Sequence, residues 1–246
     1  MNSLKIFVPA VLIVTGFMQS AQANLTDNGN SLVYDSVLNI TWMAQNNNLF
    51  KDMTASNANL INDIIAANNG VIYDSPSDTE SGGAYSLTSS DFSTYNGTMD
   101  WWGAEAWIGY LNSIHYDGFN DWSLPTTANP VSGYNQAASE MGALYYTALG
   151  LTAGTAISTS NPYYYLFSNL AIYWSASEYS SDTTQAWYFN TLTGDQSYSI
   201  KDTQLQAFAI LPGDAVVVPV PGANWLFLSS FGFLIGMMRS FRNFKI

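Results

Sequence analysis

Few of the side chains that usually carry catalysis occur in this chain of 246 residues. Cysteine is absent and His115 is the only histidine, so the chain offers no thiol nucleophile and no histidine-based metal cluster. His115 follows an apolar helical stripe, and a protonated histidine is stabilised by the dipole at a helix C-terminus. We therefore favour a structural role for His115 over that of a catalytic base, and no G-x-S-x-G motif indicates a serine nucleophile. Paired carboxylates stay open as catalysts, because acids that share a cleft can be far apart in sequence.

One short segment has the side chains of a calcium ligand set. Asp117, Asn120 and Asp121 place three oxygen-bearing side chains around Gly118, and oxygen ligands suit Ca²⁺. The segment lacks the spacing and the terminal glutamate of an EF-hand loop. A turn formed by the Asx residues alone is therefore the favoured interpretation, with calcium as the alternative and no other cofactor predicted. Three further acids offer loose cation contacts: Asp78, Glu80 and Asp91.

Aromatic side chains supply the remaining chemistry, since they make up 15% of the sequence. A ring with an apolar face and a polar tip suits the binding of sugar rings or of a protein partner. Such rings lie in or beside predicted loops, although many others must fill the core. The predicted ligand-binding residues are Tyr163, Tyr164, Tyr165, Trp101 and Trp102, and Tyr179 has the same setting.

The segment from Asp100 to Thr126 organises the prediction of structure. An apolar stripe with helical spacing predicts an amphipathic helix, with Asp100 as its N-cap. The members of the stripe are Ala104, Trp107, Ile108, Leu111 and Ile114. Residues 116–121 have the composition of a turn, and residues 122–125 are predicted as a short strand that ends at a proline.

The flanking patterns predict an α+β domain with a mostly antiparallel sheet and two or three packed helices, for which a C-type-lectin-like arrangement is one candidate. A hairpin is expected over 24–43 and a helix over 58–67 that ends at a left-handed position in 68–70. Residues 74–99 are expected to form a long surface insertion, either mobile or partly ordered. A second helix is expected over 135–149, with Ala138, Met141, Tyr145 and Ala148 on one face, and residues 151–170 are expected to be loop. Strands are expected over 172–176, 186–190, 196–200 and 206–211, in one antiparallel sheet with a turn at 192–195.

These motifs together resemble a known family. The helix W-x-x-A-x-x-W-x-x-x-L, which starts at Trp101, is followed by Y-x-G-F-x-D-W-x-L-P-T up to Thr126. This pair of motifs is similar to the Lcl C-terminal domain family, which caps a bacterial collagen-like adhesin. Further matches extend the resemblance over residues 30–214, among them Tyr-Trp-Ser-Ala-Ser-Glu at 173–178 and Pro-Gly-Asp at 212–214. The chain departs from the family at Ser123 and Leu211, where the family usually has arginine.

The N-terminus has the pattern of a secretory signal peptide. Lys5 precedes an apolar run over 6–18, and small residues stand at the −3 and −1 positions of a cleavage site between Ala23 and Asn24. The run is too short for an ordinary membrane-spanning helix. An uncleaved N-terminal anchor is the alternative.

The C-terminus has the pattern of a short membrane anchor. A proline-containing spacer over 215–222 precedes 16 uncharged residues, Ala223–Met238, and a basic tail over 239–246. At about 1.5 Å per residue the apolar segment spans about 24 Å, against about 30 Å of hydrocarbon. The basic tail predicts that the helix spans the membrane with its tail in the cytoplasm and the domain outside. A buried core helix is the disfavoured alternative.

This order of spacer, apolar segment and basic tail resembles a PEP-CTERM-type sorting signal. The spacer sequence Val218, Pro219, Val220 and Pro221 is similar to the V-P-L-P-A variant, from which Val220 and Gly222 depart. The resemblance implies recognition by an exosortase, cleavage near the motif, and transfer to the surface of a bacterium that makes exopolysaccharide. A plain membrane anchor is the alternative. The chain then divides into five parts: signal peptide 1–23, exported domain 24–214, linker 215–222, transmembrane helix 223–238 and tail 239–246.

The charge of the exported domain excludes several partners. All 18 acidic residues lie between Asp27 and Asp214, where only Lys51 and Lys201 are basic, so the domain has a net charge of −16. Such a surface repels nucleic acid and anionic lipid and attracts cations. The signals at both ends, the family resemblance and the missing catalytic residues together predict a non-enzymatic protein of the cell surface or extracellular matrix, which binds exopolysaccharide or a surface protein in adhesion or biofilm. The alternative function is a carboxylate-dependent glycan hydrolase.

Overall fold

The first and last strands of the described chain belong to one antiparallel sheet. The computed structural model describes residues 25–217, apart from 45, 74–82, 129 and 168–169. In this sheet β1 (Leu25–Gly29) pairs with β2 (Leu32–Asp35), β2 with β3 (Ile40–Met43), and β3 with β11 (Ile210–Pro212). The predicted hairpin over 24–43 is confirmed.

A second antiparallel sheet has the order β10-β9-β8. Its strands are β8 (Ile172–Glu178), β9 (Gln185–Asn190) and β10 (Asp195–Ile200), as predicted, with turn residues 191–194 between β9 and β10. The expectation that residues 206–211 complete this sheet is wrong, because β11 pairs with β3 and only Gln206 forms a bridge to β8. Residues 207–211 are all buried, since this segment passes through the core between the two sheets.

The predicted central helix is α3 (Trp101–Ser113), and Asp100 caps it by accepting a hydrogen bond from the Gly103 N–H at 2.7 Å. The stripe is buried as expected except for Ile114, which lies past the helix and is 44% exposed. The turn at 116–121 is confirmed as the 3₁₀ turn η2 (Tyr116–Gly118) and the extended residues after it. The predicted strand over 122–125 is wrong, because this segment forms one isolated bridge, between Ser123 and Ile210. The Trp122 N–H is instead bonded to the Asn112 side chain at 2.7 Å.

The predicted helix over 135–149 is shorter and less regular. It begins at α4 (Glu140–Ala143), where Ser139 accepts a hydrogen bond from the Gly142 N–H, and continues as the π-helical turn η3 (Leu144–Ala148). Met141, Tyr145 and Ala148 are buried, but Ala138 is exposed and precedes the helix. The Ser139 cap fixes the start of the helix, which the apolar pattern alone placed too early.

The expected insertion over 74–99 is ordered in its second half. Residues 83–99 contain β5 (Ala84–Ser86), the 3₁₀ turn η1 (Ser89–Asp91), β6 (Phe92–Ser93) and β7 (Thr98–Met99). Leu87, Phe92 and Met99 join the core, so partial order, one of the two expected alternatives, is confirmed for residues 83–99. Residues 74–82 lie outside the described chain.

Two helices and a short strand cover the same side of the molecule. The helix predicted over 58–67 is α2 (Leu60–Ala67), and its left-handed end is confirmed at Asn69, with φ 56°, and Gly70, with φ 74°. The helix α1 (Asn46–Ser56) was not predicted. The strand β4 (Val71–Tyr73) follows α2 and pairs with β5.

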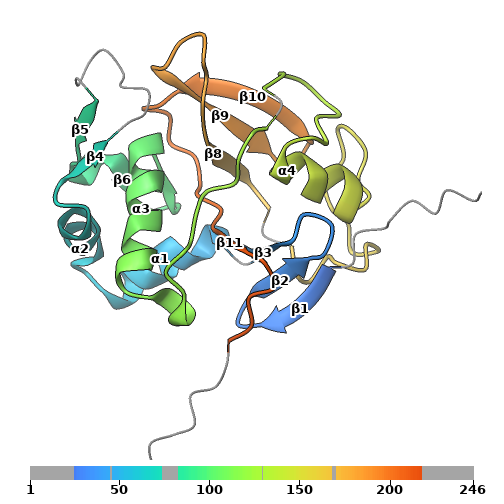
Figure 1. The fold of residues 1–246 in the computed structure, drawn as a ribbon, viewed down its shortest axis with the longest axis horizontal. Helices are drawn as coiled ribbons and strands as arrows, with labels where there is room; N and C mark the ends of the chain where they lie inside the picture. Colours follow the sequence, from blue (N-terminus) through green and yellow to red (C-terminus); the bar gives the residue numbers. More distant parts are fainter. Residues whose placement is uncertain (1–24, 45, 74–82, 129, 168–169, 218–246) are drawn as a thin grey trace, which may run out of the picture.

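The three-stranded sheet separates two hydrophobic clusters. Adjacent residues of β8 point to opposite sides, so that Trp174 joins the cluster around α3 and Tyr173 joins the cluster around α4 and η3. Figure 1 shows α2 and α3 on the left, α4 on the right and β8 between them. The α+β class with antiparallel sheets is therefore confirmed, with four α-helices among the described residues.

Within the described residues no helix is long and apolar enough to cross a membrane. The signal peptide with its Ala23–Asn24 cleavage site, the sorting motif Val218–Pro221, the apolar segment 223–238 and the basic tail lie outside the described residues.

Candidate functional site

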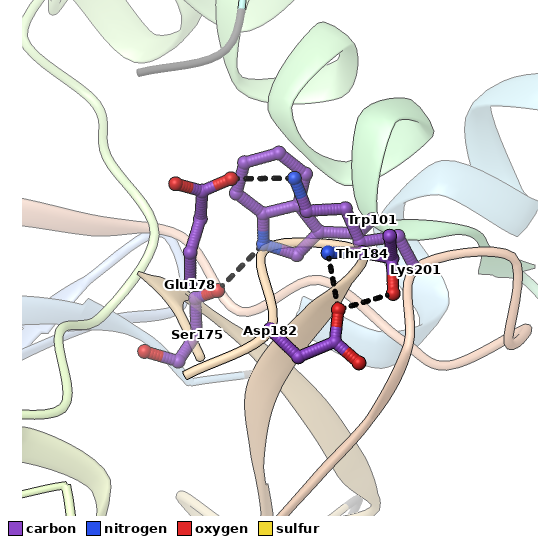
Figure 2. Close-up of polar contacts among 6 residues, drawn as sticks. All are labelled: Trp101, Ser175, Glu178, Asp182, Thr184 and Lys201. Atoms are coloured by element: carbon purple, nitrogen blue, oxygen red, sulfur yellow. Dashed lines mark hydrogen bonds and ion pairs between the residues drawn. The ribbon is translucent and has the colours of Figure 1, made fainter. Parts of the chain in front are cut away.

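A buried ion pair ties together the two edge strands at one end of the three-stranded sheet. Lys201 directly follows β10 and is fully buried, and its Nζ lies 2.6 Å from Oε1 of Glu178, the last residue of β8 (Figure 2). The same ammonium lies 4.3 Å from the centre of the Trp101 ring and 5.5 Å from that of Trp102. Aromatic faces attract a cation most strongly when water is excluded, so the two tryptophans help to stabilise the buried charge.

The two tryptophans connect this ion pair to α3. The Trp101 Nε1–H donates a hydrogen bond of 2.9 Å to the Ser175 carbonyl, and the Trp101 N–H donates one of 2.9 Å to the Lys201 carbonyl. Trp101 is 4% exposed and Trp102 is 6% exposed. The prediction that these rings lie at the surface to contact a ligand is therefore wrong, because both serve as scaffold.

The loop between β8 and β9 is held rigid by a single carboxylate. Asp182 Oδ1 accepts hydrogen bonds from the Thr184 N–H at 3.2 Å and the Thr184 hydroxyl at 2.7 Å (Figure 2). Asp182 Oδ2 accepts a third bond of 2.7 Å from Gln185. These hydrogen bonds to Thr184 and Gln185 lower the pKa of Asp182, so its exposed carboxylate stays negative to lower pH than usual.

Two tyrosines stack beside this loop. The rings of Tyr179 and Tyr198 are 3.9 Å apart with an angle of 6° between their planes. Trp187 packs edge-on against both, with centroid distances of 5.6 Å to Tyr179 and 5.3 Å to Tyr198. Trp187 is buried, whereas Tyr198 is 36% exposed. We call the stacked Tyr179 and Tyr198 the tyrosine platform.

The platform is fixed by the backbone around it. The Tyr179 N–H donates to the Gln185 carbonyl, and the Asp182 N–H donates to the Tyr179 carbonyl, each at 2.9 Å. Tyr198 is paired with Trp187 in the register of β10 and β9. Rings held in one orientation lose little entropy when a ligand binds, which favours recognition. Tyr179 could be predicted from the sequence, but Tyr198 was not predicted. Its place on one face of β10 with Gln196 and Ile200, at a period of two residues, was the available signal.

The predicted site at Tyr163, Tyr164 and Tyr165 is only partly open. Tyr163 packs against the cluster around α4, and its N–H donates a hydrogen bond of 2.9 Å to Asn161. Tyr165 is 80% exposed and lies edge-on to Tyr164, with 5.5 Å between ring centres. One freely exposed ring thus remains in this loop.

The predicted calcium ligands lie on the confirmed turn after α3. Asp117 adopts a left-handed conformation with φ 51°, and burial raises the pKa of its carboxyl group. Asn120 and Asp121 are exposed. Nowhere in the described part of the chain do three or more His, Cys, Asp or Glu side chains gather in a group that could hold a metal ion. Calcium binding by Asp117, Asn120 and Asp121 therefore stays a prediction.

His115 lies just past α3, where its side chain is exposed and its backbone is left-handed, with φ 51°.

Two buried carboxylates have structural partners. Asp91 is 2% exposed and accepts hydrogen bonds from the Thr88 N–H at 2.7 Å, the Thr88 hydroxyl at 2.8 Å and the Tyr85 hydroxyl at 3.1 Å. The expectation that Asp91 collects cations loosely is therefore wrong. Burial raises the pKa of Asp100 to about 8, against the opposing hydrogen bond from Gly103, and the negative charges of Asp91 and Asp202 add to the rise.

A groove between two helices and a hairpin has no carboxylate in its lining. It has a volume of about 380 Å³ and lies between α1, α2 and the tip of the β6–β7 hairpin. Its polar lining residues are Lys51, Thr54, Asn57 and Thr94. Neither Asp91 nor Asp100 reaches it, so the groove and the buried acids are separate features.

Comparisons with known proteins found no family model that matches this chain and no curated protein that matches its sequence. The resemblance to the Lcl C-terminal domain family therefore rests on the motifs in the sequence alone.

Proposed function

We propose that this chain is an exported bacterial protein of the cell surface or extracellular matrix that binds polysaccharide without catalysis, through the tyrosine platform. The observation that carries the proposal is a pair of stacked aromatic rings, exposed at Tyr198 and half-buried at Tyr179, beside a hydrogen-bonded loop and a buried ion pair. Sugar rings present apolar C–H faces and hydroxyl groups, which suit a tyrosine face and its polar tip. Adhesion or biofilm formation is the proposed biological setting.

The proposed route to the surface relies on the two ends of the sequence. Export follows from the signal peptide with cleavage between Ala23 and Asn24, and anchoring from the apolar segment 223–238. An exosortase-type transpeptidase is the proposed partner at Val218, Pro219, Val220 and Pro221. The arrangement of the domain supports a tether, since the Asn28 side chain donates hydrogen bonds to Asp214 at 2.7 Å and to the Ala215 carbonyl at 2.8 Å. The linker after 214 thus leaves the domain beside its first strand.

The family and the finer fold belong to the same proposal. Membership of the Lcl C-terminal domain family is supported by the motifs between residues 30 and 214. A C-type-lectin-like arrangement is supported by the first and last strands sharing one sheet. The adhesin relative is associated with sulfated polysaccharides, a ligand that the net charge of −16 and the residues Ser123 and Leu211 make unsuitable here.

A glycan hydrolase is the second candidate function. The feature in its favour is the buried Asp100 carboxyl group: burial raises the pKa of Asp100 to about 8, and a general acid must hold its proton near neutral pH. Against it, Asp100 is 4% exposed and its carboxylate caps α3. A hydrolase would be favoured if wild-type protein released reducing sugar from a panel of polysaccharides and the Asp100→Asn variant did not.

Affinity electrophoresis through gels that contain single polysaccharides tests the binding function. We expect wild-type protein to be retarded in at least one gel and Tyr198→Ala to run freely. Tyr95→Ala is the matched control, because Tyr95 is 88% exposed on a different hairpin. Equal retardation of both variants would exclude the platform as the binding site.

The intact mass of the protein from its native host tests the proposed sorting. Cell-associated and medium fractions are measured separately, and we expect a species that begins at Asn24 and lacks the residues after the Val218–Pro221 motif. A chain that still ends at Ile246 and occurs only in the membrane would contradict exosortase processing and leave a plain membrane anchor.

A further inference from the structure

We propose that the ligand of the tyrosine platform is a polysaccharide with free amino groups, such as a partly de-N-acetylated hexosamine polymer, and that Asp182 binds its ammonium groups. This inference rests on the proposed binding function and names the chemistry of the ligand at the same site. It follows from three features: the charge of the domain, the position of Asp182 and the electrostatics of the two rings.

The charge of the domain disfavours an anionic glycan. Of the two lysines between Asp27 and Asp214, Lys201 is fully buried and paired with Glu178. Lys51 lies on α1, where it lines the groove, and not on the three-stranded sheet. No lysine or arginine is therefore exposed on the described strands and loop that form the platform. A uronate or sulfate group would meet only negative charge there, whereas an amine would be attracted.

Asp182 supplies an exposed negative charge in the loop that follows the platform residue Tyr179. It closes the turn that begins at Tyr179, and its backbone N–H donates a hydrogen bond of 2.9 Å to the Tyr179 carbonyl. Its oxygens accept three hydrogen bonds, from Thr184 and Gln185, which fix the carboxylate in place. Two carboxylate oxygens have about four acceptor positions, so one remains for a ligand, and the charge itself is not neutralised by these uncharged donors.

The rings favour the same ligand. A tyrosine face carries negative electrostatic potential and attracts a cation within about 6 Å of the ring centre. An amino sugar can place its C–H face on Tyr198 and its ammonium group towards Asp182. A neutral sugar can make the contact with the Tyr198 ring but not the one with Asp182. We therefore expect it to bind more weakly than an amino sugar.

Isothermal titration of the full chain in detergent tests the inference. The probes are chitosan oligosaccharides, N-acetylated chito-oligosaccharides of the same length, and alginate oligosaccharides as the anionic comparison. We expect chitosan oligosaccharides to bind about tenfold more tightly than the N-acetylated ones, and alginate not to bind. Binding should also weaken as salt is raised, because exposed charges are screened.

Variants of Asp182 and Tyr198, with a control at Asp52, test which residues determine the affinity for chitosan. Asp182→Asn keeps the shape of the loop residue and is expected to weaken chitosan binding about threefold, the size of one exposed ion pair, without affecting the N-acetylated probe. Asp52→Asn is the control, since it removes one exposed charge on α1. Tyr198→Ala is expected to weaken both probes about tenfold or more, and its thermal unfolding is measured to verify folding.

The outcomes separate this inference from the function on which it rests. Equal affinity for both chito-oligosaccharides, with Asp182→Asn unchanged, would overturn the amine preference but leave polysaccharide binding at the platform. Loss of chitosan binding in Asp52→Asn equal to that in Asp182→Asn would reduce the effect to net charge and overturn the role of Asp182. Absence of binding to any glycan, in the titration and in the electrophoresis, would overturn both proposals.

Discussion

Two aromatic pairs lie at the same end of the three-stranded sheet and differ in their exposure. One pair is Trp101 and Trp102, and the other is Tyr179 and Tyr198. The tryptophans are covered on α3 and face the Lys201 ammonium, whereas the tyrosines stack at the surface over the edge of Trp187. Both pairs are held by hydrogen-bonded neighbours, so rigidity does not distinguish them. The difference is access: one pair stabilises a charge of the protein itself, and the other can receive a ligand.

Removal of the buried cation should give the largest effect on stability. Lys201→Met breaks the buried ion pair with Glu178, and we expect a loss of about 3–5 kcal/mol in the free energy of unfolding. Urea denaturation measures it. The double variant Lys201→Met/Glu178→Gln should recover part of the loss, and Lys51→Met, at an exposed site, should change stability by less than about 0.5 kcal/mol. A loss below about 1 kcal/mol for Lys201→Met would show that the ion pair is not what secures the tryptophans.

The second effect is the dependence of stability on pH. Burial raises the pKa of Asp100 from 3.8 to about 8, so the folded protein binds a proton that the unfolded chain releases between these values. Stability should therefore fall as pH rises from about 4 to about 8, by an amount that Asp100→Asn removes because asparagine does not titrate. Urea denaturation at several pH values within this range measures it. The control is Asp202→Asn, at an exposed residue, which should keep most of the pH dependence. If stability in Asp100→Asn depended on pH as in the wild-type protein, Asp100 would not be the group that causes the dependence.

The third effect should appear in binding more than in stability. Tyr198→Ala removes half of the stack with Tyr179, and Tyr198→Phe keeps the ring while removing the hydroxyl group. We expect the alanine variant to lose glycan affinity about tenfold and the phenylalanine variant to keep most of it, since stacking is the main contact. Affinity electrophoresis compares the two. Equal losses would assign recognition to the hydroxyl group in place of the ring face.

The smallest effect is expected in the loop that the sequence favoured. Tyr165 is 80% exposed, and Tyr165→Ala should change the free energy of unfolding by less than about 0.5 kcal/mol and leave glycan affinity unchanged. A matched pair of titrations with wild-type protein measures the affinity. A loss in Tyr165→Ala as large as that in Tyr198→Ala would move the site from the platform to residues 163–165.

The sequence predicted the elements better than their partners. The α3 stripe and its Asp100 cap follow from local spacing, and both are confirmed. The pairing of β11 with β3 could not be predicted, because the continuous apolar run that leads into β11 fits either sheet equally well. The core packing of residues 83–99 was not predicted, because the apolar residues Leu87, Phe92 and Met99 are too sparse for a periodic pattern.

At the candidate site too, the sequence predicted some of the residues but not which residues lie together. Loop composition favoured Tyr163–Tyr165 and the Trp101-Trp102 pair, since aromatics beside loops are common in binding sites. Sequence spacing does not reveal that Lys201 lies over both tryptophans, a contact between residues about 100 positions apart. Tyr179 and Tyr198 come together only through the antiparallel register of β9 and β10 and the turn that follows β8.

Hydroxyl-radical footprinting with mass spectrometry, carried out with and without chitosan oligosaccharide, tests the central claim most directly. The account predicts that the ligand protects Tyr198 and Tyr179, while Trp101 and Trp102 stay unreactive in both samples and Tyr165 reacts equally in both. Protection confined to Tyr163–Tyr165, or protection of neither tyrosine of the platform by a ligand that binds, would contradict it.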